Sequence, residues 1–500
     1  MRAIPIILVL LTLAACGGGG GGTPSPPPTP APTGLSYPSP QTFTAGTAII
    51  PLNPVVTGTV ASYSVAPALP AGLALNAASG QISGTPTAAT ASAAYTITAQ
   101  NAGGSTSFAL SITVNAATVA RLEPATSTTV ATGQSMNVFQ VLVEGGAPFP
   151  RYIDASLVTW SSSAPARAAI NANGVITGLT EGSTTITAQY LGFTTTLAVQ
   201  VSGAWQARNV TVAGQGTRRY AVYAPNFTGA STPRAALLSI HGGGGTAMIQ
   251  AQTSQLVKYA QEQQFYVVFL EGTGLIQTFN GGACCGSAQT QNVDDVAYVR
   301  AVLDDLIANF TVNAARVYST GFSNGGIMSH RLACQLADRI AGIAAVGGAS
   351  GQFNGAGTQY FACDPARPIP VLQIHSANDR NYPFAGGVGN DGISQVNFYS
   401  IDATIADWRT RNNVTSTATV ENVTPTTRCS RYATPANVAL PSAPVVLCRV
   451  DPPDVYDPAT EIVFGGGHSW PGGARSPGAG ADVPVTDFNA NAYLWSFLNP

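Results

Sequence analysis

The chain has 500 residues, which is enough for about three domains. Its 21 basic and 23 acidic residues nearly balance, and charged residues make up only 9% of the chain, against ~25% in ordinary soluble domains. Lys258 is the only lysine and the sequence contains no basic cluster, so nucleic acid is excluded as an expected partner.

The first element, residues 1–16, has the pattern of a secretory signal. "MRAIPIILVLLTLAAC" carries one positive residue, a short apolar run and small residues before Cys16. Its end resembles a bacterial lipobox, in which the cysteine is lipid-modified; an ordinary signal peptide cleaved nearby is the alternative. The run is too short for a ~20-residue membrane span and no later segment qualifies. We therefore expect an exported lipoprotein held at the membrane by its lipid, at the cell surface or extracellular.

The next segment, residues 17–34, is of low complexity. "GGGGGGTPSPPPTPAPTG" begins with six glycines and continues with a proline and threonine run that favours extended polyproline II. Such a segment cannot bury a core, so we expect a linker.

Two β-rich segments follow, residues 35–114 and 116–202. "YTITAQNAGGSTSFALSITV" predicts a hairpin, and "LPAGLALNAASGQISGTPT" predicts another. The second of these phrases resembles the family called "putative Ig domain" of bacterial surface proteins. In the second segment, Trp160-Ser-Ser and Asn173-Gly-Val-Ile-Thr-Gly178 resemble the bacterial Ig-like group 2 family. The resemblances imply two all-β sandwiches.

These two segments contain no histidine and no cysteine, and their few acidic residues do not cluster. Nothing in them supports catalysis. Two interpretations stay open, a spacer or stalk and a module that binds a polysaccharide or polymer surface.

Residues 203–500 alternate between strand and helix patterns. "RRYAVYAP", "RAALLSIH", "YVVFLEG", "RVYST", "IAGIAAVGG", "PVLQIHS" and "TEIVFGGG" predict strands. "TSQLVKYAQEQQF", "VDDVAYVRAVLDDLIANF" and "SIDATIADWRTRN" predict helices between some of them. This alternation predicts a mostly parallel sheet flanked by helices, in an α/β fold.

Six cysteines remain if Cys16 carries lipid, and an even number in an oxidising compartment implies disulfides. Cys429 and Cys448 flank a short excursion between two strand-like runs, and we predict that they pair. Neighbouring cysteines fit ordinary disulfide geometry poorly, so we expect no bond between Cys284 and Cys285. The connectivity of these two with Cys334 and Cys363 stays open. The C-x₂-C spacing of a zinc site is absent, so we expect no metal.

Gly321-Phe-Ser323-Asn-Gly325 has the G-x-S-x-G pattern between a predicted strand and a predicted helix. A glycine-rich turn that happens to hold a serine is the alternative. The strand–turn–helix context favours a nucleophile elbow, in which glycines remove side chains that would clash. We therefore predict that Ser323 is a nucleophile.

A serine nucleophile needs a base, and the chain has only four histidines. His330 lies two turns down the helix after Ser323, too far to reach back, and His241 opens the glycine-rich loop 242–245. His375 ends a strand four residues before Asp379. His468 lies in "FGGGHSWPGG", the glycine-rich loop after a strand near the C-terminus.

The order Ser323, Asp379, His468 is the nucleophile–acid–base order of α/β-hydrolases. Each residue follows a predicted strand, which places all three at one edge of the sheet. We predict that His468 is the base and that Asp379 orients it. Rivals for the acid are other aspartates in loops, namely Asp391, Asp451, Asp454 and Asp457.

In this arrangement His468 accepts the Ser323 proton as the serine attacks an ester carbonyl. The Asn324 N–H and an N–H of the 242–243 turn, assigned to Gly243, would stabilise the oxyanion. The mechanism needs no metal or organic cofactor.

Residues 205–498 resemble a family of secreted serine esterases, the poly(3-hydroxybutyrate) depolymerase and feruloyl-esterase-like family. The shared phrases are "HGGGG", "CCGSA…VDDVAYVRAVLDDL", "RVYSTGFSNGGIMSHRLACQLADRIAGIA", "PIPVLQIHSANDRNYPFAGG" and "GGGHSWPGG". The family's nucleophile, acid and base fall on Ser323, Asp379 and His468. One departure is Ser376, where the family usually has glycine, with no catalytic consequence that we see.

The resemblance implies an extracytoplasmic esterase that acts on polyhydroxyalkanoates or, alternatively, on feruloyl or acetyl esters of plant polysaccharides. An alternative of another class is a surface polymer-binding protein with an inactive hydrolase domain. Trp470 is either a cleft wall for the substrate or a packed anchor of its loop. The sequence does not indicate the oligomeric state.

Overall fold

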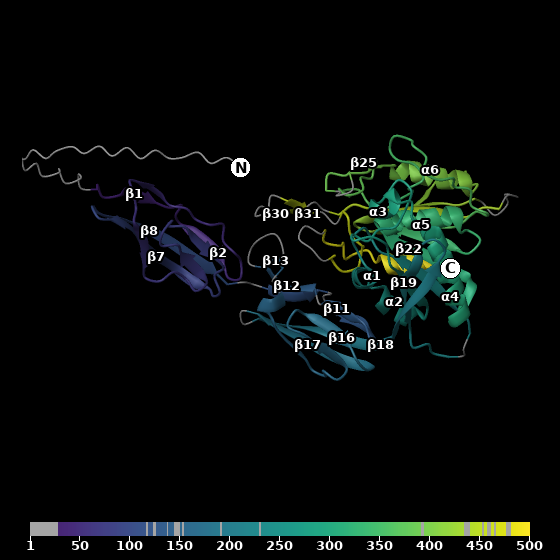
Figure 1. Cartoon of the computed structure of the whole chain (residues 1–500), viewed down its shortest axis with the longest axis horizontal. Helices are drawn as coiled ribbons and strands as arrows, with labels where there is room; N and C mark the ends of the chain where they lie inside the picture. The colour runs from purple at the N-terminus through teal and green to yellow at the C-terminus, as the bar shows by residue number, and fades with distance from the viewer. Residues whose placement is uncertain are drawn as a thin grey trace, which may run out of the picture. The chain divides into compact units, whose positions relative to one another are not determined.

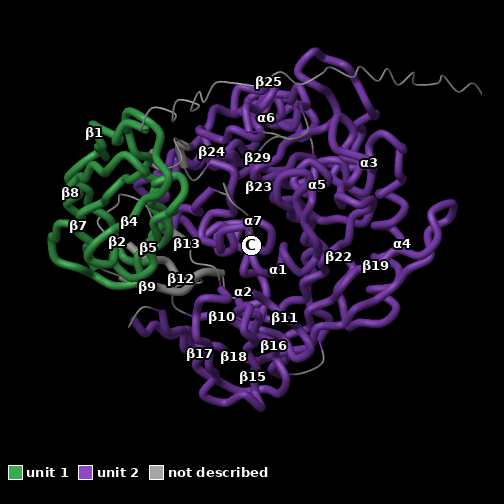
Figure 2. The backbone as a smooth tube through the Cα atoms, turned by 60° about the vertical axis from the view of Figure 1, so that its left-hand side comes forward, with its two compact units in different colours: residues 1–116 green, residues 117–500 purple. Residues whose placement is uncertain are grey.

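The computed structural model divides into two compact units, residues 1–116 and 117–500 (Figure 2). The described residues are 29–116, 119–123, 127–137, 139–144, 151–152, 155–190, 193–229, 232–391, 395–434, 441–452, 455–457, 462–464, 467–476 and 482–500. The predicted signal, Cys16 and the linker as far as residue 28 lie outside these residues.

The first unit is an all-β module. Its strands are β1 (Thr33–Ser36), β2 (Gln41–Thr44), β3 (Val55–Thr57), β4 (Ser62–Ala66), β5 (Leu73–Leu75), β6 (Ile82–Gly84), β7 (Thr90–Asn101) and β8 (Gly104–Asn115). β2, β8, β7 and β4 form one sheet, and β1–β3 and β5–β6 form antiparallel pairs. Both predicted hairpins are confirmed as β7–β8 and β5–β6. The predicted linker ended at residue 34, whereas β1 begins at Thr33 and the Asn101 side chain donates to Pro30 O.

The second unit begins with another all-β module. Its elements are β9 (Val119–Glu123), β10 (Ser127–Thr132), β11 (Ser135–Asn137), β12 (Phe139–Glu144), β13 (Arg151–Tyr152), η1 (Ala155–Leu157), β14 (Thr159–Ser162), β15 (Ala168–Ile170), β16 (Val175–Gly178) and β17 (Gly182–Tyr190). Inward residues such as Ile176, Ile186 and Leu197 alternate with exposed ones and form a core of their own. The predicted sandwich of this segment thus has the hydrophobic core that such a module needs.

One strand continues from this module into the rest of the unit. β18 (Phe193–Val212) pairs with β17 through residues 193–201 and with β19 through residues 204–212. The boundary predicted between residues 202 and 203 falls where β18 changes its partner, but the strand runs through it. Backbone hydrogen bonds therefore connect the two parts without a linker.

The remaining chain builds one large sheet. Its strands are β19 (Gly216–Ala224), β20 (Arg234–Ile240), β21 (Tyr266–Leu270), β22 (Val312–Phe322), β23 (Gly342–Val346), β24 (Val371–Ser376), β27 (Thr419–Thr424), β28 (Thr427–Tyr432) and β29 (Val445–Val450). The order is β19-β21-β20-β22-β23-β24-β29-β28-β27, and the middle run from β21 to β29 is parallel. This is the predicted α/β sheet.

Helices cover both faces of this sheet, as Figure 1 shows. They are α1 (Ala247–Ser254), α2 (Leu256–Gln263), α3 (Gly286–Thr290), α4 (Asp295–Asn309), α5 (Asn324–Gln335), α6 (Ile401–Arg411) and α7 (Ala490–Leu498). Buried side chains of α4, α5 and α6 share one core, and those of α1, α2 and α7 share the other. Leu238 and Leu237 on β20 contribute to opposite cores, as the period-2 alternation of a strand buried on both faces requires.

One predicted strand lies outside this sheet. "TEIVFGGG" was predicted to continue it, but β31 (Ile462–Phe464) pairs with β30 (Val455–Asp457) in a separate two-stranded ribbon. β25 (Gly387–Val388) and β26 (Asn397–Phe398) form another such pair. The last parallel strand is β29, whose apolar run was noted in the sequence only for its cysteine. The prediction was wrong because a short apolar run does not tell a sheet strand from an outlying ribbon.

Three disulfides occur among the described residues. Cys429 and Cys448 lie opposite each other on β28 and β29, and their predicted bond is confirmed. Cys334 bonds to Cys363, and Cys284 bonds to Cys285. The prediction that neighbouring cysteines do not pair was wrong: the peptide bond between them is cis, and the two Cα atoms lie 3.1 Å apart.

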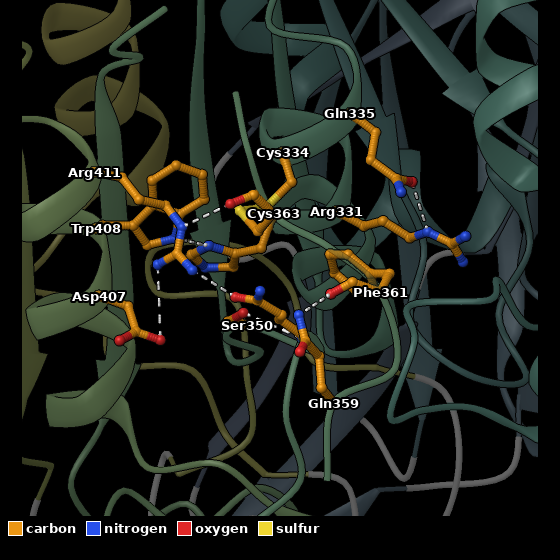
Figure 3. Close-up of a disulfide and its surroundings, with 12 residues drawn as sticks. Arg331, Cys334, Gln335, Ser350, Gln359, Phe361, Cys363, Asp407, Trp408 and Arg411 are labelled. Atoms are coloured by element: carbon orange, nitrogen blue, oxygen red, sulfur yellow. Dashed lines mark hydrogen bonds and ion pairs between the residues drawn. A yellow bond between two sulfur atoms is a disulfide. The ribbon is translucent and has the colours of Figure 1, made fainter. Parts of the chain in front are cut away.

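Figure 3 shows the surroundings of the Cys334–Cys363 disulfide, which ties α5 to the loop that follows β23. Arg411 on α6 donates to Cys363 O at 3.2 Å and to the Gln352 side chain at 2.7 Å. Arg331 on α5 lies over the ring of Phe361. The helix that follows Ser323 is thus tied to the loop after β23 by a disulfide and by a cation–π contact.

No helix in the described part of the chain is long and apolar enough to cross a membrane.

Candidate active site

Ser323 occupies the sharp turn between β22 and α5. Its backbone has φ 54° and ψ −119°, a region that residues other than glycine seldom adopt. Its amide donates to Val346 O of β23 at 2.8 Å, and its carbonyl accepts from Ile327 N at 3.0 Å. The turn is therefore held at both sides, and the strained residue is the one that the motif singled out.

The glycines of the motif are required by close approach of the backbone. A Cβ on Gly321 would lie 2.3 Å from Gly325 O, and a Cβ on Gly325 would lie 2.1 Å from Ile240 O. Any side chain at either position would collide with main chain. The G-x-S-x-G spacing thus follows from packing the turn between β20 and α5.

Ser323, His468 and Asp379 are brought together at the carboxyl ends of the parallel strands. The Ser323 hydroxyl lies 2.9 Å from His468 Nε2, and His468 Nδ1 lies 2.8 Å from Asp379 Oδ2. Asp379 accepts at its other oxygen from Asn381 N and Tyr382 N at 2.9 and 2.8 Å. A carboxylate oxygen accepts hydrogen bonds, so in neutral His468 the proton lies on Nδ1 and the lone pair of Nε2 faces the hydroxyl.

The two rival aspartates whose side chains are described form ion pairs with arginines. Asp391 pairs with Arg380 at 3.0 Å and Asp451 with Arg449 at 2.8 Å. Asp454 and the side chain of Asp457 lie outside the described residues. Among the described aspartates that were considered for the acid, Asp379 is the one that contacts His468.

The predicted oxyanion donors flank Ser323. Asn324 is the first residue of α5, so its amide has no acceptor within the helix. Gly242 passes close to Ser323, since a Cβ there would lie 3.2 Å from Ser323 Cβ, and Gly243 follows it. The Asn324 side chain both donates to Phe279 O and accepts from Phe279 N, which fixes the neighbouring loop.

The ring of His241 contacts the backbone of the glycine-rich loop that follows it. Its Nδ1 lies 2.7 Å from Gly242 O and its Nε2 accepts from Gly272 N at 3.0 Å. Burial lowers the pKa of His241 to about 4, so the ring is neutral at physiological pH. The ring therefore donates from Nδ1 and sets the direction of the Gly242 carbonyl.

Comparison with known proteins places three family matches along the chain. Residues 31–115 match the putative Ig domain, residues 116–190 match the bacterial Ig-like domain (group 2), and residues 227–391 match the phospholipase/carboxylesterase family. The putative esterase NocK of Nocardia uniformis subsp. tsuyamanensis is 30% identical over 289 residues, which are 56% of this chain and 78% of that relative.

The protein belongs to the esterase family of α/β-hydrolases.

Further similarities cover different shares of the matched proteins. Feruloyl esterase B of Piromyces equi is 30% identical over 201 residues, which are 39% of this chain but only 35% of that relative. Among solved structures, the acetyl xylan esterase from Aspergillus awamori aligns with 49% of this chain and 93% of its own, at 15% identity and a TM-score of 0.34.

The two other histidines of the esterase lie in a buried hydrogen-bond chain. Trp408 Nε1 donates to His330 Nδ1 at 2.9 Å, and His330 Nε2 lies 2.8 Å from Gln373 Oε1. Gln373 Nε2 lies 3.4 Å from His375 Nδ1, and His375 Nε2 lies 2.8 Å from Tyr382 O and 3.4 Å from Asp379 Oδ2.

Burial lowers the pKa of His330 to about 4 and lowers that of His375. Both are therefore neutral core residues, and His375 lies behind the predicted acid.

Trp470 is a packed anchor. Only 2% of its surface is exposed, and its Nε1 donates to Asn491 Oδ1 at 3.0 Å. A side chain that is buried in the core beside α7 offers no surface to a substrate. Of the two roles that the sequence left open for Trp470, this burial supports the packed anchor and not the cleft wall. An aromatic residue next to a site residue has the same sequence pattern in both roles.

The esterase has a second carboxylate at the site, which sequence reasoning missed. Asp482 Oδ2 accepts from the main-chain N–H of His468 at 2.5 Å. Burial lowers the pKa of His468, but attraction to Asp379, the hydrogen bond to Asp379 and attraction to Asp482 outweigh it, so the pKa is raised above 6.5. No motif in the sequence marks Asp482, since it follows the histidine by fourteen residues in a loop.

Proposed function

We propose that the protein is an exported serine esterase that hydrolyses carboxylic esters through an acyl-enzyme on Ser323. The observation that carries this proposal is the pair of hydrogen bonds at 2.9 and 2.8 Å that joins Ser323, His468 and Asp379. A hydroxyl within hydrogen-bond reach of a base that is itself oriented by a third group is the pattern of an activated nucleophile.

In the first step Ser323 Oγ forms a bond to the ester carbonyl carbon and its proton passes to His468 Nε2. Asp379 keeps the imidazole in the required tautomer and stabilises the imidazolium. The Asn324 and Gly243 amides donate to the oxyanion, an interaction worth ~2.7–4 kcal/mol for one donor. The imidazolium returns the proton to the leaving alkoxide as the ester C–O bond breaks.

In the second step water attacks the acyl carbon while His468 accepts a proton from it. The bond between Ser323 Oγ and the acyl carbon then breaks, Oγ regains a proton from the imidazolium, and the free acid leaves. The same imidazole acts as base and acid in both halves, so its neutral form is the starting state of each.

For the substrate we propose an acyl ester on a polymer, with feruloyl or acetyl esters of polysaccharides favoured. The names of the feruloyl esterase relatives support this choice. The quoted family phrases keep polyhydroxyalkanoate as a second candidate. We further propose that Cys16 carries a lipid anchor and that the enzyme acts outside the cytoplasmic membrane.

The test uses the full chain with its disulfides intact, beside Ser323→Ala. Release of p-nitrophenol from short acyl esters, release of ferulate from methyl ferulate and clearing of polyhydroxybutyrate suspensions would be measured. We expect turnover that the alanine variant loses, with the preferred substrate deciding between the polymer classes. Folded protein that turns over none of these esters would favour the polymer-binding alternative.

A further inference from the structure

Asp482 lies where the backbone of His468 needs support. His468 is in the loop 467–476, whose far end is held by the buried Trp470 and by the bond from Gly472 N to Val485 O at 2.8 Å. At the histidine itself, the support is the Asp482 carboxylate, which accepts the His468 amide at 2.5 Å. A hydrogen bond from an N–H to a charged acceptor is stronger than one to a neutral carbonyl.

The Asp482 carboxylate also interacts electrostatically with the ring of His468, in addition to holding its main chain. His468 faces Asp379, Asp482, Ser323 and the neutral His375. Asp482 faces His468, Asp379 and Asp391, of which Asp391 is paired with Arg380. Burial raises the pKa of Asp482, with the nearby aspartates adding to the rise, while the His468 amide and ring oppose it. The site thus holds two carboxylates around one imidazole, one at the ring nitrogen and one at the main chain.

We propose that Asp482 is a positioning residue for the esterase reaction with two separable effects. Its Oδ2 fixes the main chain of His468 so that Nε2 faces Ser323, and its negative charge stabilises the imidazolium formed when Ser323 loses its proton. This inference rests on the proposed function, because it assigns His468 the role of base.

Two substitutions separate the effects. Asp482→Asn keeps an oxygen that can accept the His468 amide but removes the charge, whereas Asp482→Ala removes both. With a short p-nitrophenyl ester, we expect Asp482→Ala to lower kcat about tenfold or more with KM unchanged. Asp482→Asn should recover most of that loss. In both variants the acid limb of kcat/KM should move to lower pH, because the imidazolium has lost a neighbouring negative charge.

The imidazole of His468 can also be titrated by NMR in the full chain, with its resonance assigned by comparison with His468→Gln. We expect the pKa of His468 in Asp482→Asn to lie below that in the wild type. Equal kcat in the alanine and wild-type proteins, or an imidazole pKa that does not change, would overturn the inference. Wild-type protein without ester turnover would refute the proposed function, and the NMR titration would still test Asp482.

Discussion

The candidate active site and the junction between the second Ig-like module and the hydrolase connect distant segments in different ways. At the site, side chains from positions 323, 379 and 468 meet through two hydrogen bonds. At the junction, which we define as β10 and β18 against α1 and α2, the main chain of β18 runs through and pairs with β17 and then β19.

The side-chain hydrogen bonds described at the junction are individually weak. Thr128 donates to the Gln255 side chain at 3.2 Å, and Lys258 donates to Ser127 at 3.0 Å. Ala131 of β10 is fully buried and belongs to the core formed with α1, α2 and α7. A site of this kind can be recognised in a sequence because it needs particular residue types at particular spacings. A strand that two modules share has only the residue pattern of any other β-strand.

The largest effect should come from the site. Replacing His468 with Gln removes the proposed base, and we expect kcat on a p-nitrophenyl ester to fall by about 10⁴-fold or more with the fold intact. His330→Gln is the matched control, since His330 is a buried residue of α5 that contacts Trp408 and Gln373. The control should have a lower free energy of unfolding but an unchanged kcat per folded molecule. Equal loss of kcat per folded molecule in both variants would contradict the assignment of the base.

Cutting the chain tests the junction next. A protein of residues 203–500 loses the pairing of β18 with β10 and β17 and uncovers the core at Ala131. We expect it to be less stable than residues 117–500 by about 3 kcal/mol or more, from several lost contacts at ~1 kcal/mol each. At an unfolding entropy of ~2.1 cal/mol/K per residue, each kcal/mol shifts the melting temperature of a protein of this size by roughly 1.6 °C, so calorimetry should show a melting temperature lower by about 5 °C or more. Equal melting temperatures would show that the second module is a removable stalk.

The pH dependence contrasts the site with the buried histidines. His468 must be neutral to accept a proton and its pKa is raised, so kcat/KM should rise with pH through a midpoint above 6.5. A pH–rate profile with no acid limb above that value would contradict the assigned environment of the ring.

The free energy of unfolding should also fall as the pH is lowered, although it depends on other histidines, whose pKa values are lowered and not raised. The folded-state pKa of His241 and of His330 is about 4, so between pH 6.5 and 4 the unfolded chain binds more protons. Their contribution is therefore complete above pH 6.5 and is lost as the pH falls toward 4, by about 3 kcal/mol for each ring. Urea unfolding at pH 7 and at pH 4.5 measures this loss. The difference in the free energy of unfolding between the two pH values should be smaller in His330→Gln.

The smallest effect should come from a single side chain at the junction. Lys258→Met removes the bond to Ser127 and keeps the apolar stem of the side chain. We expect the free energy of unfolding to fall by about 1 kcal/mol or less, with ester turnover unchanged. A loss as large as that of the 203–500 truncation would mean that this contact, and not the shared strand, holds the module.

The sequence predicted the α/β sheet, both hairpins of the first module and the Cys429–Cys448 bond, because each depends on local patterns or adjacent strands. It also led to three side chains that the structure brings together, since a G-x-S-x-G turn and a Ser–Asp–His order follow from chemistry. Asp482 could not be predicted because its partner is a main-chain amide, and every residue except proline has one. The buried position of Trp470 depends on α7, which lies twenty residues away along the chain.

If Ser323 is a nucleophile activated by His468, it should react with a phosphonate ester that labels activated serines, and the mass of the intact protein measures this reaction. We predict one adduct on the wild-type chain, located by digestion to the peptide that contains Ser323, and none on Ser323→Ala or His468→Gln. An unlabelled wild-type protein, or an adduct that persists in Ser323→Ala, would contradict the account.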